Sequence, residues 1–384
     1  MTGELARLVE WKRRIARELE EAIGREAAER ARRDHHARRR PRHCGMTIHT
    51  GIGCSYGCVY CYIWDMGFPG KPEPYPLTGE ELAYALAVNP YVVPGKTMAA
   101  YGSVTEPFQP ETTSKALEYI EAVWRWLRLP SQVSTKSLLT GDLVERLRKA
   151  EPRISVLLTI VALGEWARRL EPRAPPAEER IELAGEAVRR GLRVALFVRP
   201  IIPGVTDRQA DEIFALARRS GLSEAVLGSL RVTPGILDRL EAVGVPRSLL
   251  EARLPRKPRS RRDQVTLRMS DVKARVASVA RRHGFLLYPS ACSHNMESHG
   301  EPCHACNYGP CGPGRPRVPQ PGEVREAVEA MGGRVREVVV EYPRIVVEGL
   351  SGVDPVVVRE FLSAATRLMV SVGSGGSSRR RRRP

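Results

Sequence analysis

The sequence predicts an α/β fold in which strands and helices alternate around a parallel sheet. Two observations lead to this prediction. Strand-like and helix-like segments alternate from about residue 46 to residue 231 of the 384-residue chain. Such repeated β–α units place the strands parallel, with the helices outside. The chain is also long enough to bury a large core and to hold more than one domain.

Six strands and five helices are predicted in this region. The strands comprise residues 46–50, 97–101, 132–135, 154–160, 193–200 and 225–231. The helices comprise residues 79–88, 113–127, 141–150, 177–190 and 208–220. In folds of this kind, functional groups gather at the carboxyl ends of the strands. We therefore expect a site at that edge.

The segment after the first predicted strand is rich in cysteine. The spacing is C-x3-C-x2-C, formed by Cys54, Cys58 and Cys61. A cubane [4Fe–4S] cluster has four irons, and proteins normally supply one thiolate to each. Three cysteines on one loop would leave one iron open for another ligand. Gly53 and Gly57 suit a backbone that wraps tightly around such a cluster.

Tyr60 directly precedes the last cysteine, and this loop resembles that of the radical SAM superfamily. The resemblance extends over residues 44–290 and implies a partial (β/α)6 TIM-like radical SAM barrel. It also implies S-adenosyl-L-methionine (SAM) as cofactor, cleaved at the [4Fe–4S] cluster to a 5′-deoxyadenosyl radical. An electron donor such as ferredoxin or flavodoxin would then be a partner. The alternative is a zinc knuckle completed by Cys44, His43 or His49.

Four further runs resemble the radical SAM proteins grouped with spore photoproduct lyase. They are residues 102–111, 134–137, 170–176 with Glu179-Arg180, and 199–207. The resemblance implies that Thr105 and Glu106 face the SAM ammonium and that Lys136 faces its carboxylate or ribose. Thr159 and Arg199 are further candidates. A carboxylate suits an ammonium and a cation suits a carboxylate, although Glu106 and Lys136 are also compatible with ordinary surface charges.

The chain departs from this group at one position. Spore photoproduct lyases carry a hydrogen-donating cysteine just before the acid of the strand-two segment, and here Ser103-Val104 replaces it. The resemblance therefore implies SAM cleavage more strongly than it implies a thymine-dimer substrate.

A second cysteine-rich segment, residues 291–320, predicts a second metal site. Its spacing is C-x10-C-x2-C-x4-C, formed by Cys292, Cys303, Cys306 and Cys311. This Gly/Pro-rich stretch is too short for its own apolar core, so we expect a bound metal to stabilise its fold. Four thiolates suit either zinc or an auxiliary [4Fe–4S] cluster, and the existing cluster favours the latter. His294, His299 and His304 are alternative ligands, and one of these cysteines is an alternative hydrogen donor.

The remaining segments are basic or small. Residues 1–43 form a basic N-terminal helical extension that ends in the arginine run 30–42, and residues 253–268 form another basic stretch. Residues 321–373 predict an α-β-β-α module, and the Arg-rich tail 374–384 is predicted to be disordered. The net charge of +17 makes RNA or DNA the leading partner. A solvated arginine-rich surface is the alternative.

Composition predicts a cytoplasmic enzyme. The sequence has no apolar run of the ~20 residues that a membrane span needs, and no apolar signal region. Abundant Arg, Glu and Pro resemble thermophilic proteins, although GC-rich coding would give the same bias. The leading function is nucleic-acid modification or repair by a radical SAM enzyme. A protein- or peptide-modifying radical SAM enzyme and a non-enzymatic zinc-bearing nucleic-acid-binding protein are the alternatives.

Overall fold

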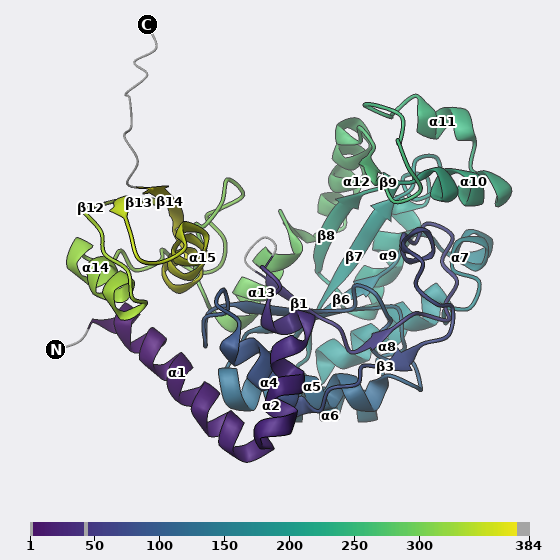
Figure 1. Ribbon diagram of the computed structural model, residues 1–384. Helices are drawn as coiled ribbons and strands as arrows, with labels where there is room; N and C mark the ends of the chain where they lie inside the picture. Colours follow the sequence, from purple (N-terminus) through teal and green to yellow (C-terminus); the bar gives the residue numbers. More distant parts are fainter. Residues whose placement is uncertain (1–2, 42–44, 375–384) are drawn as a thin grey trace, which may run out of the picture.

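The core of the protein is a seven-stranded, fully parallel sheet, as the computed structural model of residues 3–41 and 45–374 shows (Figure 1). The strand order is β1-β4-β5-β6-β7-β8-β11. The strands are β1 (Gly45–Ile48), β4 (Met98–Tyr101), β5 (Ser131–Thr135), β6 (Ser155–Thr159), β7 (Arg193–Ile201), β8 (Glu224–Ser229) and β11 (Leu286–Tyr288). Because β1 and β11 are the sheet's two edges, the barrel is open, which confirms the predicted partial barrel.

Helices cover the outer face of this sheet. They are α4 (Gly79–Val88), α5 (Thr113–Leu127), α6 (Gly141–Ala150), α8 (Ala177–Arg189), α9 (Ala210–Ser220) and α12 (Ser270–Arg282). The six predicted strands and five predicted helices are confirmed, with ends that differ by a few residues. Helix α12 and strand β11 were not predicted. Strand β11 has only three residues, and Leu286 within it is exposed, so its sequence carries little strand signal.

The sheet is buried on both faces, and the alternation of its side chains separates two apolar clusters. On β6, Val156 and Leu158 belong to the large cluster that contacts the outer helices. Leu157 instead joins Phe197 of β7 and Val226 of β8 in a small inner cluster. All five residues of β6 are buried, as expected for a central parallel strand. The inner cluster forms the floor on which a site can be built.

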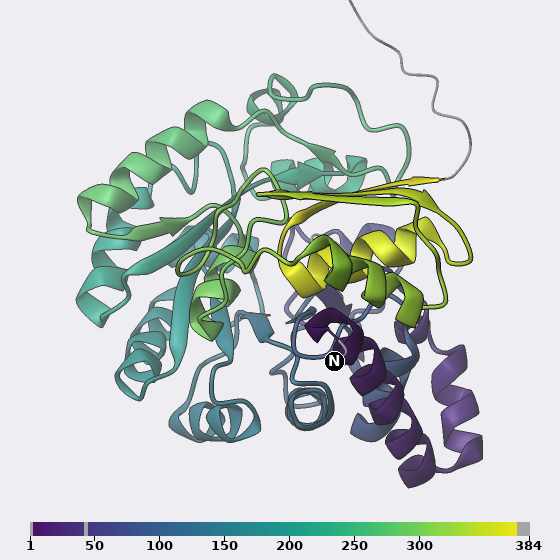
Figure 2. The same cartoon turned by 90° about the vertical axis from the view of Figure 1, so that its left-hand side faces the viewer.

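The N-terminal helices join the barrel to the C-terminal module. Helix α1 (Glu4–Ile23) contributes Leu5 and Val9 to the module's apolar cluster, while Ile15 and Leu19 lie in the barrel's cluster. Figures 1 and 2 show α1 running from the module to the barrel. The segments predicted as a separate extension and a separate module thus share one core.

The C-terminal module differs from the predicted α-β-β-α arrangement by one strand. It consists of α14 (Pro321–Ala330), β12 (Glu337–Glu341), β13 (Arg344–Leu350), α15 (Pro355–Thr366) and β14 (Met369–Ser374). The backbone turns left-handed at Arg367 (φ 59°), which ends α15 before Met369. Strand β14 then pairs parallel with β13. The tail predicted to be disordered, residues 374–384, lies outside the described residues except for Ser374, which ends β14.

Shorter elements complete the fold. They are α2 (Arg25–Arg33), η1 (His35–Ala37), β2 (Gly51–Ile52), α3 (Ile63–Met66), β3 (Glu73–Pro74), α7 (Gly164–Leu170), β9 (Arg231–Val232), α10 (Pro234–Ala242), α11 (Arg247–Glu251), β10 (Val265–Thr266) and α13 (Ala291–His299). Within the described residues, no helix combines the length and the apolar character needed to cross a bilayer.

Close packing of α8 on α9 yields a stability prediction. A Cβ added to Gly185 would lie 1.9 Å from the backbone oxygen of Ser220. We expect Gly185→Ala to lower the free energy of unfolding by about 1–3 kcal/mol, the usual cost of overpacking, despite the better helix propensity of Ala. Gly322→Ala is the control, because nothing lies within 4 Å of its added Cβ. Thermal unfolding followed by circular dichroism should show a lower midpoint for Gly185→Ala alone. Equal midpoints would contradict the prediction.

Candidate active site

The cysteine loop lies between β2 and α3 and depends on two glycines. Gly53 has φ 87°, and a Cβ there would lie 2.6 Å from the carbonyl oxygen of Pro69. Gly57 has φ 70°, and its Cβ would lie 3.0 Å from the Arg173 guanidinium. Side chains other than hydrogen are disfavoured at both positions. The expectation that glycine allows this loop to wrap tightly is therefore confirmed.

Cys54, Cys58 and Cys61 border one cavity at the carboxyl ends of the strands. We call it the barrel-mouth cavity; its volume is about 410 Å³, within the usual range for small-molecule sites. The structure brings every predicted SAM-contacting residue to the same cavity: Tyr60, Thr105, Glu106, Lys136, Thr159 and Arg199. These residues come from the cysteine loop and from the ends of four different strands. Their convergence depends on the parallel sheet.

The surroundings of the three thiols favour their protonated form. Burial raises the pKa of Cys54, Cys58 and Cys61, and nearby negative charges raise each pKa further: Glu106 acts on Cys54, Glu171 on Cys58 and Asp65 on Cys61. A metal that binds such thiols displaces their protons and removes the mutual repulsion. The site is therefore suited to a cationic metal cluster, since the thiols alone are unfavourable as thiolates.

Glu106 is anchored in the cavity wall. Its Oε1 accepts hydrogen bonds from the hydroxyls of Thr135 and Ser137, and its Oε2 accepts one from the Lys136 backbone N–H at 2.9 Å. Burial raises its pKa despite these bonds. The oxygen Oε2 accepts from this one donor among the described residues and therefore retains acceptor capacity toward a ligand.

Unpartnered polar atoms lie beside this carboxylate. The hydroxyl oxygens of Thr105 and Ser103 are buried without a hydrogen-bond partner within the described chain. Buried hydroxyls normally have a partner. Both residues border the barrel-mouth cavity, so a polar ligand there would satisfy them. The residues present therefore fit a cofactor with an ammonium or hydroxyl group.

A buried ion pair supports the loop from below. The Tyr60 hydroxyl donates to Glu171, and Arg180 donates to the other oxygen of Glu171 at 2.5 Å. Arg180 also donates to the backbone oxygen of Thr159 at 2.8 Å. Burial of Arg180 opposes its charge, but Glu171 outweighs this effect and raises its pKa. Burial and then Glu171 raise the pKa of Tyr60, which stays a neutral donor.

A second arginine, which sequence reasoning missed, holds the loop from the side. Arg239 of α10 donates to the backbone oxygens of Val59 (2.9 Å) and Cys61 (3.1 Å). Its guanidinium also pairs with Asp65 of α3 at 2.9 Å. Arg239 lies in an ordinary amphipathic helix about 180 residues downstream of the loop. No local signal in the sequence marks it.

The 170–176 run, noticed in the sequence without a role, is explained by contacts with the loop. The backbone N–H of Val59 donates to Leu170 at 3.0 Å, and that of Arg173 donates to Tyr56 at 3.2 Å. Glu171 lies between these two bonds and contacts Tyr60. The run thus forms the lower wall of the cysteine loop.

The second cysteine segment also converges. Cys303 and Cys311 form a backbone bridge in which each N–H donates to the other's carbonyl at 2.8 Å. Burial raises the pKa of Cys311 to about 12, and the charges of Cys292, Cys303 and Cys306 contribute. Cys292 is therefore close enough to the three later cysteines to affect the ionisation of Cys311. This arrangement is suited to a metal.

The histidines weighed as alternative ligands have other partners. His294 contacts Glu224 at 3.2 Å, His299 contacts Glu151 at 2.7 Å, and His304 contacts the Tyr342 hydroxyl at 2.9 Å. His49, considered for a zinc knuckle with the first loop, instead has ring nitrogens within 4.8 Å of those of His35 and His36. Cys44 and His43 lie outside the described residues. These histidines therefore contact residues other than the cysteines, and His35, His36 and His49 form a ligand group of their own within the described residues.

Comparison with known proteins agrees with this geometry. Residues 48–217 match the profile of the radical SAM superfamily. Spore photoproduct lyase in a mutant form with bound AdoMet and dinucleoside spore photoproduct is 16% identical, with a TM-score of 0.52 over 64% of this chain and 76% of that one. A second mutant form of the same enzyme is 17% identical with a TM-score of 0.52, over 63% and 75% of the two chains.

A viral relative is also similar. Uncharacterized protein ORF301 of Acidianus two-tailed virus is 24% identical over 183 residues, which cover 41% of this chain and 56% of that protein. The chain thus spans little more than half the length of this curated relative. Together with the fold and the site, these likenesses identify an enzyme of the radical SAM type. Residues 48–217 are thus similar to the radical SAM superfamily, and the barrel has a fold like that of spore photoproduct lyase.

The buried ion pair leads to the second prediction. Arg180→Met would leave the Glu171 carboxylate buried without its cation, which typically costs about 3–5 kcal/mol. We expect the double variant Arg180→Met/Glu171→Gln to recover more than half of that loss, because no unpaired charge remains. Arg189→Met on the exposed side of the same helix should change stability by less than about 0.5 kcal/mol. Urea unfolding measures all three. A single variant as stable as Arg189→Met would refute the proposed role.

Proposed function

We propose that this protein binds a [4Fe–4S] cluster through Cys54, Cys58 and Cys61, binds SAM in the barrel-mouth cavity, and modifies or repairs nucleic acid. One observation carries the cofactor assignment: three thiols border the same cavity as the unpartnered hydroxyl of Thr105 and the anchored carboxylate of Glu106. When bound, the cluster supplies the electron that cleaves the C–S bond of SAM and gives a 5′-deoxyadenosyl radical.

The chain's own residues orient the cofactor. Thr105 and Glu106 would hold the SAM ammonium, using the hydroxyl and the carboxylate oxygen Oε2 that are available. Lys136 lies 5.6 Å from the centre of the Tyr60 ring and would hold the carboxylate or the ribose. Neighbouring Cys58 and Glu171 outweigh the effect of burial on Lys136 and raise its pKa, so it stays a cation. Thr159 and Arg199 complete the wall.

Charge at the cavity mouth supports an anionic substrate. Arg199 and Arg231 both border the cavity, and Gln264 joins them from the basic 253–268 stretch. Part of that stretch is neutralised, because Arg253 pairs with Asp271 at 2.7 Å and Arg256 with Asp263 at 2.5 Å. The remaining basic side chains nevertheless extend the positive surface beside the mouth. Nucleic acid is the polyanion that such surfaces most often bind.

The second cysteine set supports an additional metal. We infer that Cys292, Cys303, Cys306 and Cys311 hold either zinc or an auxiliary [4Fe–4S] cluster. Their segment borders the barrel-mouth cavity through Ala291, the residue before Cys292. Auxiliary clusters also occur in peptide-modifying radical SAM enzymes. A peptide substrate is therefore the second candidate, and this segment is the observation that favours it.

Position 103 bears on the hydrogen donor. The Ser103 carbonyl accepts a hydrogen bond from the Tyr62 hydroxyl at 2.6 Å, so the backbone here is ordered around a serine where the lyases have cysteine. Among the described residues that border the cavity, the only thiols are those of Cys54, Cys58 and Cys61, the proposed cluster ligands. Cys292 is the next thiol beyond its wall, and it is our candidate for a donor if the second set holds no metal.

The third prediction tests SAM cleavage. Anaerobically reconstituted protein with dithionite and SAM should release 5′-deoxyadenosine, because one iron of the cluster lacks a protein ligand. Cys58→Ala should abolish release and most of the iron–sulfur absorbance. Arg219→Gln is the control, since this exposed residue of α9 lies outside the loop and the cavity and the variant should retain the product. Normal SAM cleavage by Cys58→Ala would show that the loop is not the site.

The fourth prediction tests the second metal. A variant with Ala at Cys54, Cys58 and Cys61 should retain metal, because the other four cysteines form a separate ligand set. About four irons per chain would indicate an auxiliary cluster. One zinc would indicate a structural staple, since closed zinc sites with four cysteines lack an open position. Elemental analysis that finds no metal in this variant would exclude both assignments.

A further inference from the structure

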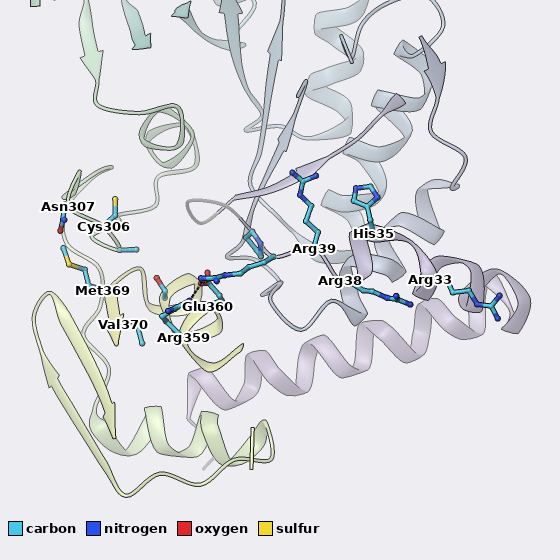
Figure 3. Close-up of a pocket in the computed structure, with 14 residues that line it drawn as sticks. Arg33, His35, Arg38, Arg39, Cys306, Asn307, Arg359, Glu360, Met369 and Val370 are labelled. Carbon is cyan, nitrogen blue, oxygen red and sulfur yellow. Dashed lines mark hydrogen bonds and ion pairs between the residues drawn. The ribbon is translucent and has the colours of Figure 1, made fainter. Parts of the chain in front are cut away.

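A second, larger cavity lies between the C-terminal module and the N-terminal basic segment (Figure 3). We call it the arginine cavity; its volume is about 1190 Å³. Three stretches border it: residues 33–41, residues 305–307 and residues 359–370. All of them lie outside residues 48–217, the part that matches the superfamily profile. The cavity is therefore built by what this chain adds to the radical SAM domain.

The lining of this cavity is strongly positive. It contains Arg33, Arg38, Arg39, Arg40 and Arg359 against the single carboxylate of Glu360, a net of four positive charges. Figure 3 shows Arg33, Arg38 and Arg39 on the N-terminal segment, and Arg359 and Glu360 on the C-terminal module.

Their existing bonds leave capacity for a ligand. Arg40 donates to Glu360 at 3.0 Å, and Arg359 contacts the same oxygen at 3.4 Å. Arg33 pairs with Glu29 at 3.5 Å. The Arg38 side chain is exposed and has no hydrogen bond or ion pair with a described residue, while its backbone N–H donates to His35 at 3.1 Å. Arg40 and Arg359 share the single carboxylate of Glu360. Because a guanidinium has five N–H donors, most of the donors of both arginines stay available. The wall therefore presents several donors to an anion.

The second cysteine segment connects the two cavities. Cys306 borders the arginine cavity, while Ala291, directly before Cys292, borders the barrel-mouth cavity. A chain-like ligand held by the arginines would therefore lie beside Cys306 of this segment.

We propose that the arginine cavity binds the phosphodiester backbone of the nucleic-acid substrate. The cavity is too large and its arginines too dispersed for one phosphate group to satisfy. Guanidinium groups match phosphate oxygens in geometry as well as charge. Phe, Tyr and Trp are absent from its described lining, so the contacts are to phosphates and not to stacked bases. This inference rests on the proposed action on nucleic acid.

A charge-neutralising variant tests the cavity. Arg33→Gln/Arg38→Gln removes two exposed cations from its wall, and Arg219→Gln/Arg281→Gln removes two exposed cations from α9 and α12 elsewhere. The probes are fluorescein-labelled single strands of about 20 nucleotides, longer than a typical ~4–16-nucleotide site. Fluorescence anisotropy compares DNA and RNA of the same sequence and shows which of the two nucleic acids binds more tightly.

We expect the cavity variant to bind about tenfold more weakly near 100 mM salt, and its log–log salt slope to be smaller by about 1.4. The control variant should match the wild type. Equal losses in both variants, or none in either, would overturn the assignment. The substrate-free release of 5′-deoxyadenosine is measured in parallel: its retention shows that the variants fold, and its absence in the wild type would refute the proposed function separately.

Crosslinking locates the ligand independently of affinity. A strand with 4-thiouridine or 4-thiothymidine at several positions should crosslink, on near-ultraviolet irradiation, to peptides that contain residues 33–41, 305–307 or 359–370. Crosslinks confined to residues 253–268 would place the backbone beside the barrel mouth only and would overturn the proposal.

Discussion

The buried Arg180–Glu171 ion pair is the interaction on which the site depends. Taking two charges out of water is costly, and the pair is stable only because its remaining donors and acceptors have partners. Tyr60 of the cysteine loop and the backbone of β6 at Thr159 supply them. The pair therefore fixes four elements relative to one another: the cysteine loop, the 170–173 segment, β6 and α8. The three thiols face the cavity because this frame is rigid.

The central fold could be predicted because its information is local. Period-two and helical patterns in successive segments gave six strands and five helices, and the spacing of Cys54, Cys58 and Cys61 gave the first site. Residues at strand ends, such as Glu106 and Lys136, followed from the resemblance of their runs to the spore photoproduct lyase group. What could not be predicted was long-range: Arg239 supports a loop about 180 residues away, and a helical pattern alone does not show what an arginine contacts.

Two histidines show the same limit of sequence-based prediction. His294 and His299 lie near the second cysteines in sequence, which made them reasonable ligands. In the fold, each is buried and contacts a carboxylate of the barrel, Glu224 or Glu151. These contacts attach α13 to the sheet and place Ala291 at the cavity wall. His294 and His299 were thus considered as ligands because they are near cysteines in sequence, but in the fold they position α13.

Helix α1 also has a consequence for how the protein is made. Its first turns pack Leu5 and Val9 against Val324, Phe361 and other residues of the C-terminal module. During synthesis these turns leave the ribosome before the barrel does, and their partners leave after it. Their apolar surface therefore stays uncovered while the whole barrel is translated, and it is buried only when the two ends of the described chain meet. Contacts of such long sequence separation form slowly, so we expect the module to close over α1 as a late step of folding.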